Sequence, residues 1–130
     1  MIVDSSAVLA ILFREEDTLR FAEAIEAATT CRMSAANFLE AAIRIDRGGN
    51  AIASDAFDDF IRETGILIEP ATVEHAHLAR RAYRAYGEGT GHPTKLNFGD
   101  CFAYALAEAT GEPPLFKGDD FAHTDLRSGS

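Results

Sequence analysis

The sequence has no apolar run long enough to span a membrane, and no basic segment followed by an apolar core at its start. The first absence excludes a membrane-spanning helix. The second gives no indication of export, so we expect a cytoplasmic protein without membrane contact. Only two cysteines occur, Cys31 and Cys101, and their separation matches no zinc-binding pattern. Two reduced, buried thiols are the better interpretation for a protein that is not exported.

Basic residues are also scarce. Twelve Lys and Arg stand against 21 Asp and Glu, which gives a formal net charge of -9. This balance argues against a broad basic surface of the kind that binds nucleic acid nonspecifically, although a local basic patch stays open. Net charge bears on solubility and on encounter with partners rather than on the fold.

The length and the apolar content indicate one packed domain. A chain of 130 residues suits a single core, and a hydrophobic fraction of 47% favours a globular fold over disorder. No internal repeat, linker or low-complexity segment divides the sequence. We therefore expect one domain over residues 1–127, and a flexible tail or expression remnant over residues 128–130.

Short apolar segments alternate with helical patterns along the whole chain. Strands are predicted at residues 1–4, 31–33, 66–68 and 115–117. Helices are predicted at residues 5–13, 15–28, 35–46, 51–63, 73–86 and 99–110, with Ser5 or Ser6, Ser34 and Thr72 as N-caps. This alternation predicts an α/β fold, a three-layer α/β/α sandwich with a short, mainly parallel central sheet. The helix at 35–46 is apolar almost all round, so we expect it to be well buried.

Four acids stand in apolar or glycine-marked surroundings. Asp4 ends the first strand, Glu40 lies within an apolar helical run, Asp100 opens a mostly apolar helix, and Asp119 follows the last strand and a glycine. Ligands of open parallel sheets bind beyond the carboxyl ends of the strands, and these positions converge on that rim. Acids gathered in one place repel each other and are costly to desolvate, unless a hard divalent cation binds them.

Each acid alone also has a purely structural interpretation. Asp4 is a good N-cap, Glu40 can pair with a basic residue four positions later, and Asp100 can favour its helix through the macrodipole. Asp119 and Asp120 can be turn residues. All of these interpretations must hold together at one rim, so the combination favours a metal site.

Carboxylates without a His or Cys cluster favour Mg²⁺ or Mn²⁺ over Zn²⁺. Such an ion can supply an activated water and stabilise a leaving oxygen at a phosphate. Ser6, two residues after Asp4, can orient a carboxylate or a metal-bound water, or it can simply cap the helix.

The order of these motifs resembles that of the PIN-domain ribonucleases, and specifically of the VapC-type toxins of bacterial toxin–antitoxin pairs. The similarity rests on four segments that together span essentially the whole chain: Met1-Ile-Val-Asp4-Ser-Ser-Ala, Met33-Ser-Ala-Ala-Asn-Phe-Leu-Glu40, Leu96-Asn-Phe-Gly-Asp100-Cys-Phe-Ala-Tyr-Ala and Leu115-Phe-Lys-Gly-Asp119-Asp-Phe-Ala-His-Thr-Asp125.

The resemblance implies a Mg²⁺-dependent endoribonuclease, with Mn²⁺ as a possible substitute, that cuts structured RNA such as tRNA or rRNA and inhibits translation. It implies a cognate VapB-type antitoxin and a homodimer. Asp4, Glu40 and Asp100 match the core acids, with Asp4 and Asp100 as the first metal ligands. Asp119 fits best as the fourth acid, and Asp120 or Asp125 can replace or assist it.

A local phosphate-binding patch is a further hypothesis. Arg80 and Arg84 lie on one predicted helix, Lys95 follows in a glycine-rich loop, and Lys117 precedes Asp119. A solvated helix face is the alternative for each of these cations.

Two other functions fit the acids less well. A Mg²⁺-dependent phosphotransfer or phosphohydrolase domain would need a further Asp after Asp4 or after the strand at 66–68, where this chain has none. A non-catalytic binding module would not need all four acids.

Overall fold

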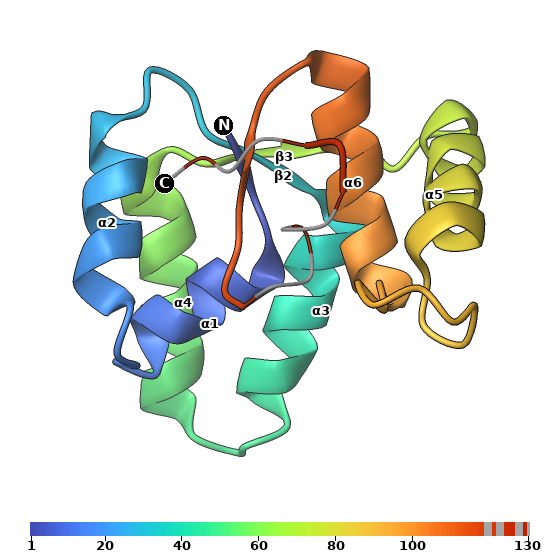
Figure 1. The fold of residues 1–130 in the computed structure, drawn as a ribbon. Helices are drawn as coiled ribbons and strands as arrows, with labels where there is room; N and C mark the ends of the chain where they lie inside the picture. The colour runs from blue at the N-terminus through green and yellow to red at the C-terminus, as the bar shows by residue number, and fades with distance from the viewer. Residues whose placement is uncertain (119–120, 122–123, 127–128, 130) are drawn as a thin grey trace.

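In the computed structural model, which describes residues 1–118, 121, 124–126 and 129, strands and helices alternate along the chain (Figure 1). The strands are β1 (Ile2–Val3), β2 (Arg32–Ser34), β3 (Leu67–Glu69) and β4 (Pro114–Leu115). The helices are α1 (Ser5–Leu12), α2 (Thr18–Ala27), α3 (Ala35–Asp46), α4 (Ala51–Thr64), α5 (Val73–Tyr86) and α6 (Phe98–Thr110).

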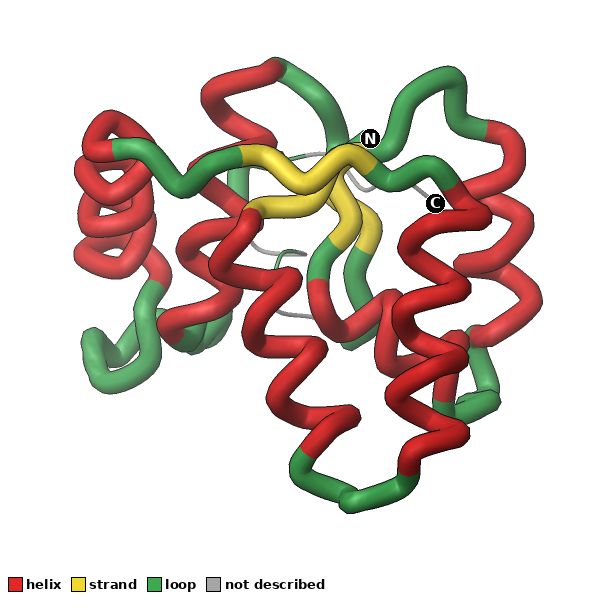
Figure 2. The backbone as a smooth tube through the Cα atoms, turned by 180° about the vertical axis from the view of Figure 1, so that it is seen from behind, coloured by secondary structure: helices red, strands yellow, loops and turns green. Residues whose placement is uncertain are grey.

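The strands form one parallel sheet in the order β3-β2-β1-β4. Ile2 lies opposite Arg32 on one side and Pro114 on the other, so the first strand is central. Figure 2 shows the short strands enclosed by helices. The predicted parallel α/β architecture is confirmed.

The two faces of the sheet carry different cores, because successive residues of a strand point to opposite sides. Val3 joins a cluster that includes Phe21, Met33 and Phe57, and it is covered by α1, α2, α3 and α4. Ile2 instead packs against Leu106 of α6, and α5 covers α6 on its outer side. The molecule is therefore a three-layer sandwich, as the sequence predicts.

The first and last strands are shorter than predicted, and the two others keep their predicted length but lie one residue later. The last strand was expected to continue to Lys117, but β4 ends at Leu115 because the Lys117 N–H donates to the Ser6 hydroxyl, 2.9 Å away, instead of to a neighbouring strand. The strand expected at residues 66–68 lies one residue later, at β3. The second helix begins only at Thr18, after the acids that were expected to open it.

The prediction that Ser5 or Ser6 caps the first helix is wrong. Asp4 is the N-cap, and its Oδ2 accepts the Ser6 N–H at 3.0 Å. Strand β1 thus passes into α1 with Asp4 as the only residue between them. The caps predicted at Ser34 and Thr72 are confirmed.

Helix α3 is also less buried than predicted. Its buried stripe consists of Asn37, Ala41 and Ile45, spaced four residues apart. Leu39 and Ile43 are 56% and 54% exposed. The helix packs by one narrow face only, and the side chains beside that stripe, including Glu40, stay accessible.

Among the described residues, no helix is long and apolar enough to cross a membrane. Near the chain end, the Gly129 N–H donates to the Pro114 carbonyl at 2.7 Å. The domain limit at residue 127 stays a prediction.

Candidate active site

Asp4 is fixed by the junction of β1 and α1. The residue is 2% exposed, which is unusual for an acid. Its Oδ2 accepts the Ser6 N–H at 3.0 Å and the Ser6 hydroxyl at 2.5 Å. The same acid therefore caps a helix and faces the carboxyl end of the central strand.

Asp100 is fixed in a similar way at the start of α6. Its Oδ2 accepts the Asn97 N–H at 3.0 Å, and its own N–H donates to Asn97 Oδ1 at 2.9 Å. This reciprocal pair is a capping box, which holds the carboxylate within the first turn. The residue is 7% exposed.

Glu40 links the two capped helices. The Ser5 hydroxyl donates to Glu40 Oε1, and Ser5 directly follows Asp4. The Glu40 carboxylate also lies against the Cα of Gly99, where a Cβ would overlap both carboxylate oxygens. Because Gly99 directly precedes Asp100, the chain neighbours of Asp4 and of Asp100 both touch Glu40. The structure thus brings these three predicted acids to one rim.

Asn37 is a residue of this site that the sequence reasoning missed. It is fully buried on α3, one turn before Glu40, and its Nδ2 donates to the Gly99 carbonyl at 2.9 Å. This bond fixes α3 against the start of α6, so the Glu40 carboxylate meets Gly99. A polar amide on the core stripe three residues before the key acid was the available signal.

Ser6 connects Asp4 to the segment that precedes Asp119, the predicted fourth acid. Its hydroxyl donates to Asp4 and accepts the Lys117 N–H at 2.9 Å. Asp119 and Asp120 lie outside the described residues. Within the described part of the chain, no three His, Cys, Asp or Glu side chains come close enough together to hold one ion. The donor set instead suits an ion held by one or two carboxylates and waters, which is how Mg²⁺ is commonly bound.

Asp125, predicted to replace or assist the fourth acid, is bound to α6. Its Oδ1 accepts the Tyr104 hydroxyl at 2.6 Å, one turn beyond Asp100 on α6. Burial, together with this carboxylate, raises the pKa of Tyr104 well above its usual value. Asp125 therefore ties the C-terminal segment to α6.

The four cations predicted to contact RNA are not gathered in one patch. The Lys117 ammonium pairs with Glu15 at 2.6 Å, and this partner raises the pKa of the lysine. Arg80 and Arg84 line one hollow on α5 together with Glu74, and Arg80 also lines a second hollow with Tyr83. Lys95 is exposed in the loop before α6, at a positive φ of 54°.

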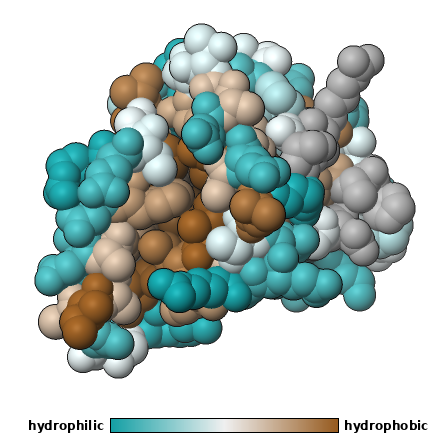
Figure 3. All heavy atoms as spheres, turned by 90° about the vertical axis from the view of Figure 1, so that its left-hand side faces the viewer, coloured by the Kyte–Doolittle hydropathy of each residue, from teal (hydrophilic) through white to brown (hydrophobic). Residues whose placement is uncertain are grey.

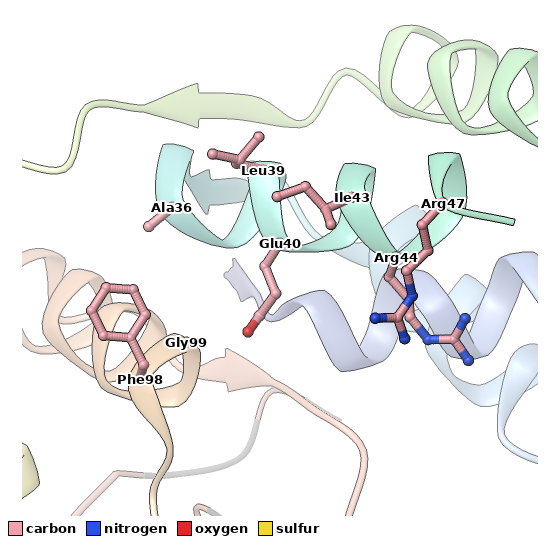
Figure 4. Close-up of a pocket in the computed structure, with 8 residues that line it drawn as sticks. All are labelled: Ala36, Leu39, Glu40, Ile43, Arg44, Arg47, Phe98 and Gly99. Atoms are coloured by element: carbon pink, nitrogen blue, oxygen red, sulfur yellow. The ribbon is translucent and has the colours of Figure 1, made fainter. Parts of the chain in front are cut away.

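A hollow of about 370 Å³ opens beside Glu40. Glu40, Arg44 and Arg47 project from the same side of α3, and Phe98 stands at the start of α6 (Figure 4). Neither arginine was singled out in the sequence as a site residue. Their spacing from Glu40, four and seven residues along one helix, was the signal that places them on its face.

Comparison with known proteins assigns the family. The profile of the PIN domain matches residues 1–126. Ribonuclease VapC28 of Mycobacterium tuberculosis is 47% identical over 127 residues, which cover 98% of this chain and 96% of the relative. Ribonuclease VapC42 of the same species is 45% identical over 127 residues, with coverage of 98% and 97%.

Solved structures share the fold at much lower identity. The crystal structure of Mycobacterium tuberculosis VapC20, a sarcin–ricin-loop-cleaving toxin, has a TM-score of 0.73 at 16% identity and covers 97% of this chain and 95% of its own. A toxin–antitoxin complex from Klebsiella pneumoniae has a TM-score of 0.70, also at 16% identity, with coverage of 99% and 97%. The resemblance read from the sequence is confirmed: the chain belongs to the PIN-domain family and, within it, to the VapC ribonucleases.

Proposed function

We propose that this protein is a Mg²⁺-dependent endoribonuclease toxin of a type II toxin–antitoxin pair. It cleaves structured RNA, such as tRNA or rRNA, in the cytoplasm and thereby inhibits translation. The observation that carries the proposal is the position of Glu40 between Ser5 and Gly99, the chain neighbours of two buried acids. Three acids on one rim are costly without a cation, and their chemistry suits a hard one.

Asp4 and Asp100 would hold the ion, and Glu40 and Asp119 would complete the set of acids. Both of the first two are buried and approach from helix starts, so their oxygens keep a fixed separation. When bound, Mg²⁺ or Mn²⁺ would supply an activated water and stabilise the leaving oxygen of the phosphodiester.

The hydroxyl groups of the chain orient these carboxylates. Ser6 donates to Asp4, and Ser5 donates to Glu40, so each acid presents its remaining lone pairs in a defined direction. With Ser5 held on one side and Gly99 on the other, Glu40 can accept a proton from water near the phosphate without moving its helix.

The partners follow from the relatives. One solved relative cleaves the sarcin–ricin loop, and another is part of a toxin–antitoxin complex. We infer for this chain a VapB-type antitoxin that covers the acids, and a homodimeric toxin. On the side where α2 and α4 lie, apolar surface gathers in a hollow framed by polar residues (Figure 3), a surface suited to an antitoxin segment. Arg80, Arg84, Lys95 and Lys117 stay proposed RNA contacts.

The proposal is tested by incubating the purified chain with total bacterial RNA in Mg²⁺, Mn²⁺ or EDTA, beside an Asp100→Asn variant. Discrete fragments that need both the metal and Asp100 are expected, and sequencing their ends names the target. If the folded, antitoxin-free protein cleaves no RNA with either metal, the proposal fails and the non-catalytic binding module takes its place. Release of phosphate from a small phosphoester instead would point to a phosphohydrolase.

A further inference from the structure

On the basis of the proposed nuclease function, we propose that the hollow beside Glu40 is a subsite for unpaired RNA that flanks the cleaved bond. Arg44 and Arg47 bind backbone phosphate there, and Phe98 stacks on a base. All three residues line the same hollow as Glu40. The subsite would hold the strand in register with the acids.

The two arginines are available cations in an acidic protein. Neither takes part in an ion pair with any described residue, whereas Arg32, Arg62 and Lys117 are each paired with carboxylates. The Arg44 guanidinium lies over the Phe13 ring, 5.1 Å from its centroid. Stacking through its flat face leaves the in-plane N–H donors directed outward, as phosphate binding requires.

Phe98 is exposed to solvent, as a residue that contacts a ligand must be, and does not belong to the core. As the first residue of α6, directly before Gly99, it is 79% exposed. Its ring meets the Phe102 ring edge-on, with centroids 5.1 Å apart and planes at 69°. This contact fixes the orientation of the ring and leaves most of it open for stacking.

The surface continues past Phe98. The same ring lines a second hollow, of about 380 Å³, together with Arg80 and Tyr83 of α5. Cations thus line the hollows on both sides of an exposed aromatic ring. Alternating cations and aromatic side chains are the usual means of binding single-stranded nucleic acid, because the backbone and the base faces are recognised independently of sequence.

RNA fits this surface better than an acidic protein segment does. Arg44 and Arg47 project to the Glu40 side of α3, where the scissile phosphate must lie (Figure 4), and Leu39 and Ile43 give the same hollow an apolar part against which a base can pack. With a net charge of -9, the protein needs local cations to retain a polyanion next to its carboxylates.

The test measures RNA binding separately from cleavage. A single-stranded oligoribonucleotide with one 2-aminopurine and a terminal fluorophore is titrated with the parent protein in EDTA, so that anisotropy reports binding and 2-aminopurine quenching reports stacking. The variants are Phe98→Ala, Phe98→Trp, and Arg44→Gln combined with Arg47→Gln. Arg20→Gln is the matched control, because Arg20 also lies over a phenylalanine ring, 4.5 Å from its centroid, but on α2. Thermal unfolding verifies that each variant is folded.

We expect Phe98→Ala to weaken binding about ten-fold and to abolish quenching, and Phe98→Trp to restore both. The double arginine variant should lower the slope of log affinity against log salt by about 1.4, or about 0.7 for each lost phosphate contact. Arg20→Gln should change neither quantity.

The inference and the proposed function fail in different ways. If the parent cleaves RNA while the Phe98 and arginine variants bind and cleave as well as it does, the subsite is wrong and the nuclease stands. If these variants keep RNA binding but lose affinity for the antitoxin, the hollow is a protein-binding surface and the inference is overturned. If the parent neither binds nor cleaves RNA, the nuclease proposal falls, and the subsite with it.

Discussion

The acids and the cations around this site are held in opposite ways. Asp4 and Asp100 are buried, and each accepts a backbone N–H at the start of a helix. Arg44, Arg47 and Arg80 extend from helix surfaces on long side chains, without ion pairs to described residues. Groups that must keep fixed positions relative to each other are thus placed by the backbone, whereas groups that would meet a flexible substrate are not.

Glu40 lies between these two extremes. It is exposed on α3, yet Ser5 and Gly99 confine its carboxylate. Among the described residues, Ser5 and Gly99 contact its flexible side chain, so a small local change can alter its position without unfolding the protein.

The strongest test of the backbone-held acids removes their charge and keeps their caps. Asn caps a helix as well as Asp does, so Asp4→Asn should leave the unfolding temperature nearly unchanged. RNA cleavage should fall by about 10³-fold or more, because several kcal/mol of metal-linked transition-state stabilisation are lost. Asp100→Asn should behave alike. Cleavage of the same RNA at the parental rate by either variant would show that the charge of that acid is not needed.

The side-chain-held acid is tested by Gly99→Ala. The added methyl group would overlap the Glu40 carboxylate, which can swing away at little cost to the fold. We expect cleavage to fall by about 10²-fold, the typical effect of displacing a catalytic group by about 1 Å.

Gly65→Ala is the control with the opposite expected result, a loss of stability without a loss of cleavage. Gly65 ends α4 at a φ of 69°, with open space around it. An alanine there should cost about 1–2 kcal/mol of folding free energy and leave cleavage unchanged. A loss of stability without a loss of activity in Gly99→Ala would show that Glu40 is not held as described.

Ser6→Ala should have a smaller effect. It removes the hydroxyl that donates to Asp4 and accepts the Lys117 N–H, but it leaves the backbone cap in place. Loss of such an orienting partner typically costs about 10-fold to 100-fold in metal affinity or activity. Cleavage measured as a function of Mn²⁺ concentration would separate an effect on metal affinity from an effect on activity. An unchanged curve would mean that the Ser6 hydroxyl does not orient the site.

The smallest effect concerns Cys101, the buried residue that follows Asp100 on α6, and the rigidity of the helix around it. Burial, and to a lesser extent the Asp100 charge, raise the pKa of the Cys101 thiol to about 11. The folded protein should therefore react slowly with a thiol reagent at pH 8, and rapidly once denatured. Because the unfolded chain releases this proton first, the thiol should lower the folding stability as the pH rises from about 9 toward 11. Fast labelling of the native protein would mean that the start of α6 unfolds locally and exposes Cys101.

Much of the site could be predicted from the sequence because its acids coincide with local signals. Asp4 at a strand end and Asp100 at a helix start are placed by chain-local rules, and the structure puts both on one rim. The contacts between distant segments could not be predicted in this way. The Asn37 bond to Gly99 and the Ser6 bond to Lys117 join residues 62 and 111 positions apart.

The cations were predicted less well for a related physical reason. The Arg80 and Arg84 cluster was conspicuous in the sequence, and the two arginines line one hollow on α5, but Glu40 does not line it. Arg44 and Arg47 are unremarkable in the sequence and become neighbours of Glu40 only because α3 exposes that face. The predicted burial of α3 hid them, because an apolar helix in a small domain can still leave one side to solvent.

The most direct test of the central claim is crystallographic. A crystal of the protein soaked in Mn²⁺ is measured at a wavelength where manganese scatters anomalously, beside crystals of Asp4→Asn and Asp100→Asn. The account predicts an anomalous peak about 2 Å from carboxylate oxygens of Asp4 and Asp100 in the parent, weakened or absent in both variants. A peak that touches neither acid, or an equally strong peak in the variants, would contradict it.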